Sequence, residues 1–203
     1  MARGIDTKCI HLEEDEGQCS HYGALSYPIY QTATYAHPGV GQSTGFDYSR
    51  LQNPTREHLE KIVAALENGI DALAFSTGMA AITLVMELFK PGDHLIIDAD
   101  LYGGSIQLFD NVSSKNGIHF SRIDCWKENV ESYVNENTKA IYIETPTNPM
   151  MNVTDIAALA EIAKVFPVFI RRLKLTQGMS LVIISIAVGK SLGSLLYYAQ
   201  GWM

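Results

Sequence analysis

The sequence predicts an α/β fold in which helices flank a mainly parallel β-sheet. Short apolar segments alternate with helix-like segments along the first 164 residues of the chain. This alternation is typical of βαβ units, whose strands run parallel. With 47% hydrophobic and 18% charged residues the chain can bury a core, which excludes a globally disordered protein.

The first strong helix is predicted to begin at Pro54. Asn53 is a favourable N-cap, proline suits the first turn, and apolar residues recur at helical spacing from Leu59 to Leu66. Gly69 then ends the helical pattern.

The later elements continue the alternation of strand and helix. The sequence predicts strands at 72–75, 94–97, 118–123 and 140–144, and helices at 79–89, 104–114, 126–135 and 155–164, the last capped by Thr154. Turns follow three of these strands, at Ser76–Gly78, Asp98–Gly104 and Thr145–Pro149. Because ligands of parallel sheets bind beyond the carboxyl ends of the strands, we expect these turns to gather at one edge.

Charge and cysteine content narrow the class of protein. A net charge of -7 argues against nucleic acid or an anionic membrane surface as the main partner. Cys9, Cys19 and Cys125 form no CxxC pair and are odd in number, which indicates free thiols and no metal site of that kind. The segment Met1–Leu12 lacks the apolar run of a secretory signal. These features predict a soluble cytoplasmic protein.

Two segments carry groups that suit a phosphate. Gly78 and Met79 open a predicted helix, where free N–H groups and the helix dipole attract an anion. Tyr48 and Arg50 place a phenol and a guanidinium on one loop, and arginine matches phosphate geometry. The alternatives are a tightly packed turn at Gly78 and an exposed loop arginine beside a packing tyrosine.

Two further residues follow predicted strands. Tyr102 lies on a glycine-rich loop, where its ring can stack on a flat cofactor or merely cover the sheet. Asn148 lies in a turn braced by Pro146 and Pro149, which directs it to the same edge or simply makes a rigid loop.

Taken together, five ordered motifs resemble the Cys/Met-metabolism family of pyridoxal-phosphate (PLP) enzymes, over about residues 5–164. This family includes cystathionine γ-synthase, cystathionine γ- and β-lyases, methionine γ-lyase and the homoserine sulfhydrylases. The resemblance implies the large PLP domain of the aspartate-aminotransferase type (fold type I), incomplete in this chain. The motifs are Tyr27–Thr34, Tyr48–Arg50 with Asn53–Thr55, Ser76–Ala80, Tyr102–Gly104 and Glu144–Pro149.

The resemblance also implies roles for the candidate residues. The backbone at Gly78 and Met79 would hold the phosphate of PLP, together with Tyr48 and Arg50 of a neighbouring subunit. Family members are accordingly expected to be homo-oligomers, organised as dimers of dimers.

The ring of the cofactor has two expected neighbours in this sequence. Tyr102 would stack on the pyridine ring and help to move protons, which makes it the catalytic candidate, and Asn148 would lie near the 3′-oxygen. PLP is an electron sink that lets α- and β-protons leave an amino acid. The implied reaction is trans-sulfuration, by γ-elimination or γ-replacement on cystathionine, homoserine esters or related small amino acids.

The sequence departs from the family after Lys164. The family continues with V-D-N-T, whose Asp pairs with the pyridinium nitrogen, and S-x-T-K, whose Lys forms the internal aldimine. Neither motif occurs here, and the last acidic residue is Glu161. Lys190 is a weak candidate for the missing lysine, because its spacing from Asn148 is short and its neighbours differ.

Residues 165–203 therefore form a divergent, apolar and basic second part after the family-like residues 1–164. A frameshift or a truncated gene model explains the abrupt change, the absent acidic residues and the short length together. Membrane insertion of 181–199 is disfavoured by Lys190 at its centre, and a natural binding module is the third alternative. We expect this chain to be inactive; the alternative function is that of a non-catalytic fragment or a binding pseudoenzyme.

Overall fold

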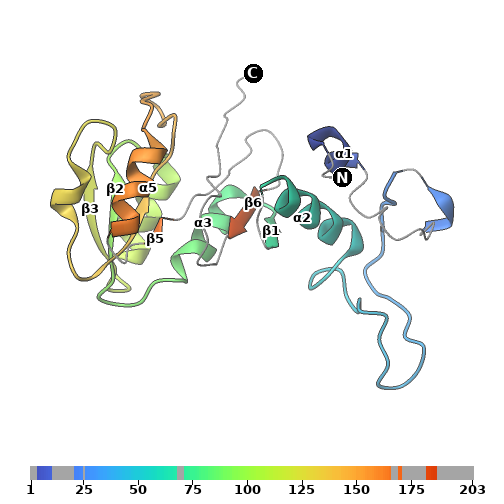
Figure 1. Ribbon diagram of the computed structural model, residues 1–203. Coiled ribbons are helices and arrows are strands. Elements are labelled where there is room, and N and C mark those ends of the chain that lie inside the picture. The colour runs from blue at the N-terminus through green and yellow to red at the C-terminus, as the bar shows by residue number, and fades with distance from the viewer. Residues whose placement is uncertain are drawn as a thin grey trace.

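The computed structural model describes residues 4–10, 21–24, 26–67, 71–165, 169–170 and 182–186. A four-stranded sheet at one end of the molecule has the order β3-β2-β4-β5, and every neighbouring pair runs parallel (Figure 1). The strands are β2 (His94–Asp98), β3 (His119–Ile123), β4 (Thr138–Tyr142) and β5 (Phe169–Ile170). The predicted α/β class with a mainly parallel sheet is confirmed.

Helices cover both faces of this sheet. On one face, α3 (Gly78–Met86), α4 (Gly103–Leu108) and the π-helical turn η3 (Phe109–Ser113) pack on alternate residues of β2 and β4, such as Leu95 and Ala140. On the other face, α5 (Ile156–Val165) and the 3-10 turn η4 (Val130–Tyr133) pack on Ile96 and Ile141. The central strand β2 is buried along its whole length. A strand buried on both faces explains its continuous apolar sequence.

A histidine at the amino end of β2 ties three strands together. His94 is buried, its Nδ1 lies 2.8 Å from Oγ1 of Thr138 on β4, and its Nε2 lies 2.9 Å from Oγ of Ser121 on β3. Burial, with a smaller contribution from His119, lowers the pKa of His94. The neutral imidazole can accept one of these hydrogen bonds and donate the other, so it fixes the register of the strands.

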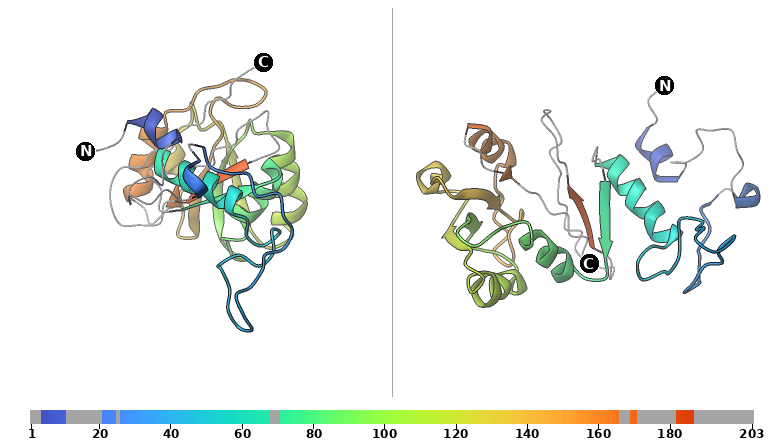
Figure 2. Two further views of the ribbon diagram at one scale, coloured as in Figure 1. Left: turned by 90° about the vertical axis from the view of Figure 1, so that its right-hand side faces the viewer. Right: turned by 90° about the horizontal axis from the view of Figure 1, so that it is seen from below.

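The first strand lies outside the four-stranded sheet. β1 (Asp71–Phe75) pairs antiparallel with β6 (Val182–Ile186), and Figure 2 shows this pair between the sheet and helix α2. The Ala74 N–H donates to the Glu60 carboxylate of α2 (2.8 Å). Because this bond occupies a donor of the strand, the side chain protects β1 from further strand pairing.

Helix α2 (Pro54–Leu66) begins and ends close to the predicted positions. Oδ1 of its N-cap Asn53 accepts the Thr55 N–H (2.9 Å), while Nδ2 lies within hydrogen-bond distance of the Tyr30 carbonyl and the Ser49 hydroxyl. Asn53 therefore holds the extended arm 26–52 against the helix. The shorter elements α1 (Ile5–Ile10) and η2 (His21–Gly23) lie at the same end of the molecule as α2 (Figure 1).

Two local predictions are wrong. Only η4 forms where a helix at 126–135 is expected, because Asn129 bonds to the Glu131 N–H and Val130 is the one buried residue of the turn. The cap of α5 is Asp155, whose Oδ1 accepts the Ala158 N–H (3.1 Å). Thr154 instead donates its own N–H to Oγ1 of Thr145.

Much of the divergent part 165–203 lies outside the described residues. Helix α5 runs across the boundary expected after residue 164 and ends at Val165. In the part of the chain that the structure describes, no helix is long and apolar enough to cross a membrane. Both cysteines in that part, the exposed Cys9 and the buried Cys125, are free thiols.

Candidate cofactor site at the carboxyl edge of the sheet

The loops that follow β2 and β4 are joined by side-chain to backbone hydrogen bonds. Glu144, two residues after β4, accepts the Tyr102 N–H (3.0 Å) and the Ser105 hydroxyl (3.2 Å). Asp100, two residues after β2, accepts the Met150 N–H (3.0 Å). Two carboxylates therefore link the loops in opposite directions, and the predicted gathering of these turns is confirmed.

The turn after β1 reaches the same edge even though β1 belongs to another sheet. Thr77 caps α3 by accepting the Ala80 N–H (3.1 Å), which leaves Gly78 and Met79 in the first turn of the helix. Both residues are half-buried. The sulfur of Met79 lies 2.9 Å from the point where a Cβ on Gly104 would stand. The start of α3 therefore touches the start of α4.

Tyr102 lies at this meeting point. A Cβ on Gly104 would stand 2.6 Å from Cε1 of Tyr102, which is closer than real Cβ contacts allow. A side chain at position 104 would therefore displace the tyrosine ring and the Met79 sulfur from their present places. The ring is nevertheless 45% exposed, so one part of it remains open to a ligand.

Glu144 is a half-buried carboxylate that the sequence analysis does not single out as functional. Burial raises its pKa, and the hydrogen bonds from Tyr102 and Ser105 oppose that rise. Asp100 adds a smaller repulsion that also raises the pKa. An acidic residue directly after an apolar strand, at the ligand-binding edge of a parallel sheet, is the signal that could have identified it.

Asp98, the last residue of β2, is fully buried. Desolvation is the main cause that raises the pKa of its carboxyl to about 6. Its Oδ1 accepts the Asp100 N–H (3.2 Å), whereas Oδ2 has no hydrogen-bond partner among the described residues. Asp98 thus supports the loop that carries Asp100 and Tyr102.

Asn148 lies half-buried on the loop after β4. Thr147 closes this loop: its N–H donates to the Asn152 carbonyl (2.9 Å), its carbonyl accepts the Met151 N–H (3.1 Å), and its Oγ1 accepts the Asn152 N–H (2.8 Å). The peptide bonds before Pro146 and Pro149 are cis. Because Met150 is bonded to Asp100, Asn148 lies at the same edge as Tyr102.

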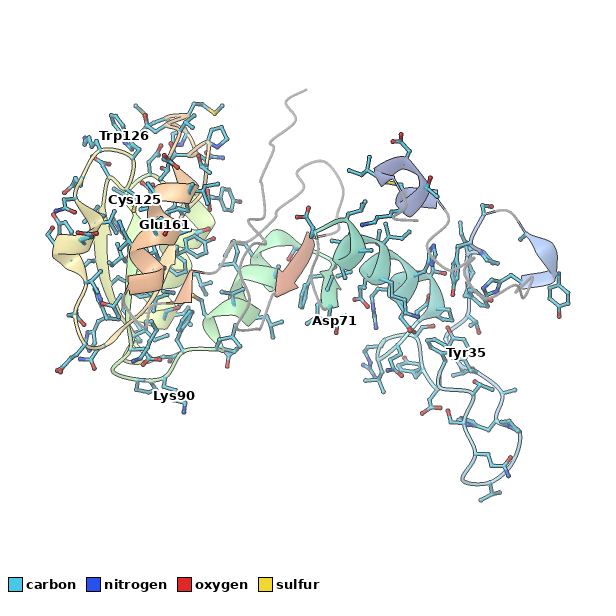
Figure 3. All side chains as sticks on the ribbon, in the orientation of Figure 1. Tyr35, Asp71, Lys90, Cys125, Trp126 and Glu161 are labelled. Atoms are coloured by element: carbon cyan, nitrogen blue, oxygen red, sulfur yellow. The ribbon has the colours of Figure 1, made fainter. Side chains whose placement is uncertain are left out.

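Tyr48 and Arg50 lie elsewhere. The guanidinium carbon of Arg50 is 5.1 Å from the centre of the Tyr48 ring, and Tyr48 pairs with Thr34 on the extended arm. In Figure 3, Tyr35 marks this arm, whereas Cys125 and Trp126 mark the sheet at the opposite end of the molecule. A single chain does not bring Tyr48 and Arg50 to Tyr102.

The remaining candidate, Lys190, lies outside the described residues. Within the described ranges no cluster of three or more His, Cys, Asp or Glu residues could hold a metal ion.

Comparisons with known proteins identify the family of residues 6–170. The family model of Cys/Met metabolism PLP-dependent enzymes matches residues 6–170. The chain is 46% identical over 165 residues to a cystathionine gamma-synthase/O-acetylhomoserine (thiol)-lyase of Bacillus subtilis, covering 81% of this chain and 44% of that protein. It is 51% identical over 143 residues to a cystathionine gamma-lyase of the same organism, covering 70% and 38%.

Solved structures give the same result. The crystal structure of cystathionine gamma-lyase from Lactobacillus plantarum complexed with L-serine matches with a TM-score of 0.73 and 39% identity, over 86% of this chain and 46% of that chain. The chain thus spans less than half the length of these relatives. A second family model, Stage V sporulation protein AB, matches residues 152–199.

Proposed function

The chain belongs to the family of Cys/Met-metabolism PLP-dependent enzymes, and we propose that it supplies the phosphate- and ring-binding side of a trans-sulfuration site. The observation that carries this proposal is the meeting of Met79 and the Tyr102 ring at Gly104. It places a helix start, which suits an anion, beside a half-exposed aromatic ring, which suits a flat heterocycle.

The described residues fit PLP. Gly78 and Met79 would bind the phosphate through their backbone N–H groups, and the exposed part of Tyr102 would lie against the pyridine ring. Asn148 lies on the loop after β4, which is bonded to Asp100, and would orient the pyridine ring from the side of that loop. When bound, PLP supplies an electron sink for deprotonated amino acids.

Tyr48 and Arg50 would serve the site of a neighbouring copy of the chain. Support comes from their position on the extended arm, which lies at the opposite end of the molecule from Cys125 and Trp126 of the sheet region (Figure 3). Arg50 would add a cation to the phosphate, and the arm would cover the site from a second subunit.

The substrate class follows from the relatives. Their names include cystathionine synthases and lyases, so we propose cystathionine, a homoserine ester or a related sulfur amino acid. In the proposed site, Tyr102 would exclude water from the reacting face and exchange a proton through its hydroxyl.

A reducing, cytoplasmic location would agree with the free thiol of the exposed Cys9.

We further propose that the 203-residue chain binds PLP without turning over substrate. Its sequence contains neither the V-D-N-T nor the S-x-T-K motif expected from the family. The purified chain with PLP and L-cystathionine should therefore release 2-oxo acid no faster than PLP alone. Saturable turnover above that background would contradict the proposal, and the variant Tyr102→Phe would then show whether the turnover arises at this site.

A further inference from the structure

We propose that Glu144 is the positioning residue that sets the Tyr102 ring in place for the cofactor. This inference rests on the proposed PLP site. In this proposal Glu144 does not contact the cofactor. It determines where the ring of Tyr102 lies.

Glu144 accepts two hydrogen bonds from residues at the start of α4. One oxygen takes the Tyr102 N–H (3.0 Å) and the other takes the Ser105 hydroxyl (3.2 Å). Tyr102 is the N-cap residue of α4, yet its own side chain makes no capping bond to the described helix. Glu144 therefore supplies the cap of α4 from another loop, and it does so through the backbone of Tyr102 itself.

The position of the Tyr102 backbone determines where its ring lies. Cε1 of Tyr102 and the sulfur of Met79 both lie within 3 Å of the point where a Cβ on Gly104 would stand. A small rotation of the Tyr102 backbone would move the ring off this surface and away from the start of α3. Fixing the N–H thus fixes the ring at the place where the proposed phosphate and pyridine sites meet.

Glu144 carries its carboxylate at a half-buried position. Burying a carboxylate is unfavourable unless hydrogen bonds compensate it, and burial is the main cause that raises the pKa of Glu144. The two donors from α4 oppose this rise most, a side-chain hydrogen bond with Tyr142 opposes it less, and the nearby Asp100 adds to it. The charged form of the half-buried Glu144 is therefore stabilised mainly by its hydrogen bonds to the start of α4.

A second hydrogen bond joins the two loops without Glu144, so that variants at Glu144 can test the proposal. Asp100 holds the Met150 N–H independently of Glu144. In a Glu144→Ala variant the loops therefore remain joined, while the Tyr102 N–H loses its acceptor. Glu144→Gln keeps one acceptor oxygen and serves as the conservative variant.

The test measures binding of 4′-deoxypyridoxine 5′-phosphate to the 203-residue chain by calorimetry. This analogue keeps the ring and phosphate but has no aldehyde, so it does not react with lysine amines. We expect Glu144→Ala to weaken binding roughly tenfold, the loss of one stacking contact, and Glu144→Gln to recover most of it. Asp155→Ala is the matched control, because it removes a carboxylate that caps α5 and leaves α4 intact.

A double-mutant cycle separates positioning from a merely structural role. If Glu144 acts through the Tyr102 ring, Glu144→Ala has no further effect on binding in a Tyr102→Ala background, which keeps the backbone N–H. Without ligand, the ¹⁹F resonance of 3-fluorotyrosine at position 102, assigned with Tyr102→Phe, should shift in Glu144→Ala and not in Asp155→Ala.

The outcomes distinguish this inference from the function on which it rests. Absence of saturable binding by the unmodified chain overturns the proposed function, and this inference with it. Normal binding by Glu144→Ala, or an equal loss in the Tyr102→Ala background, overturns only the positioning role.

Discussion

Replacing Gly104 with valine is expected to weaken binding of 4′-deoxypyridoxine 5′-phosphate about a hundredfold, or by about 2.7 kcal/mol. A Cβ at this position would stand 2.6 Å from Cε1 of Tyr102 and 2.9 Å from the sulfur of Met79. The Tyr102 ring and the Met79 sulfur must then shift, which moves the ring from the place where the cofactor is proposed to bind. Calorimetric titration of the purified variant measures the loss.

Gly103→Val is the matched control for this prediction. A Cβ on Gly103 would meet no described atom within 4 Å, although it lies on the same turn of α4. We expect affinity within about threefold of the unmodified chain for Gly103→Val. Equal losses in the two variants would mean that the contact at Gly104 does not form the site.

Replacing Asp98 with asparagine is expected to stabilise the chain at pH 7 by up to about 3 kcal/mol. The folded carboxyl has a pKa of about 6 against an ordinary value of 3.8, so the folded state binds the proton more tightly than the unfolded state. The free energy of unfolding is therefore highest below pH 4 and falls as the pH rises to 6. Asparagine keeps an acceptor for the Asp100 N–H and carries no charge to bury.

Urea unfolding followed by tryptophan fluorescence, at pH 4 to 7, measures this effect as the difference between variant and unmodified chain. The difference should grow with pH up to about 6 and then level off. Asp110→Asn is the control, because Asp110 is an exposed residue paired with Arg122 and its loss should change stability by less than about 1 kcal/mol. A pH-independent difference for Asp98→Asn would contradict the buried charge.

Local sequence patterns predict most of the fold. β1, β2, β3 and α2 lie close to their expected positions, because apolar periodicity and the Asn53 cap act over short distances. The helix expected at 126–135 is absent, because asparagine side chains bond to the local backbone more favourably than a helix permits. The pairing of β1 with β6 could not be predicted, since it depends on contacts between distant segments.

The site was predictable in part. Tyr102, Met79 and Asn148 share one sheet edge, as expected for turns that follow parallel strands. The role of Gly104 as the contact point depends on side-chain packing, which the sequence pattern does not encode. The sequence pattern predicts Glu144 as the end of a strand, whereas its link to Tyr102 depends on two hydrogen bonds to α4 that no local pattern indicates.

The central claim is that α3 and Tyr102 form the phosphate- and ring-binding side of a PLP site. It is tested most directly by titrating the unmodified chain with 4′-deoxypyridoxine 5′-phosphate and with unphosphorylated 4′-deoxypyridoxine. We expect one molecule of the phosphorylated compound to bind saturably per chain, and the unphosphorylated compound to bind at least about tenfold more weakly. Equal affinity for the two compounds, or no saturable binding of either, would contradict it.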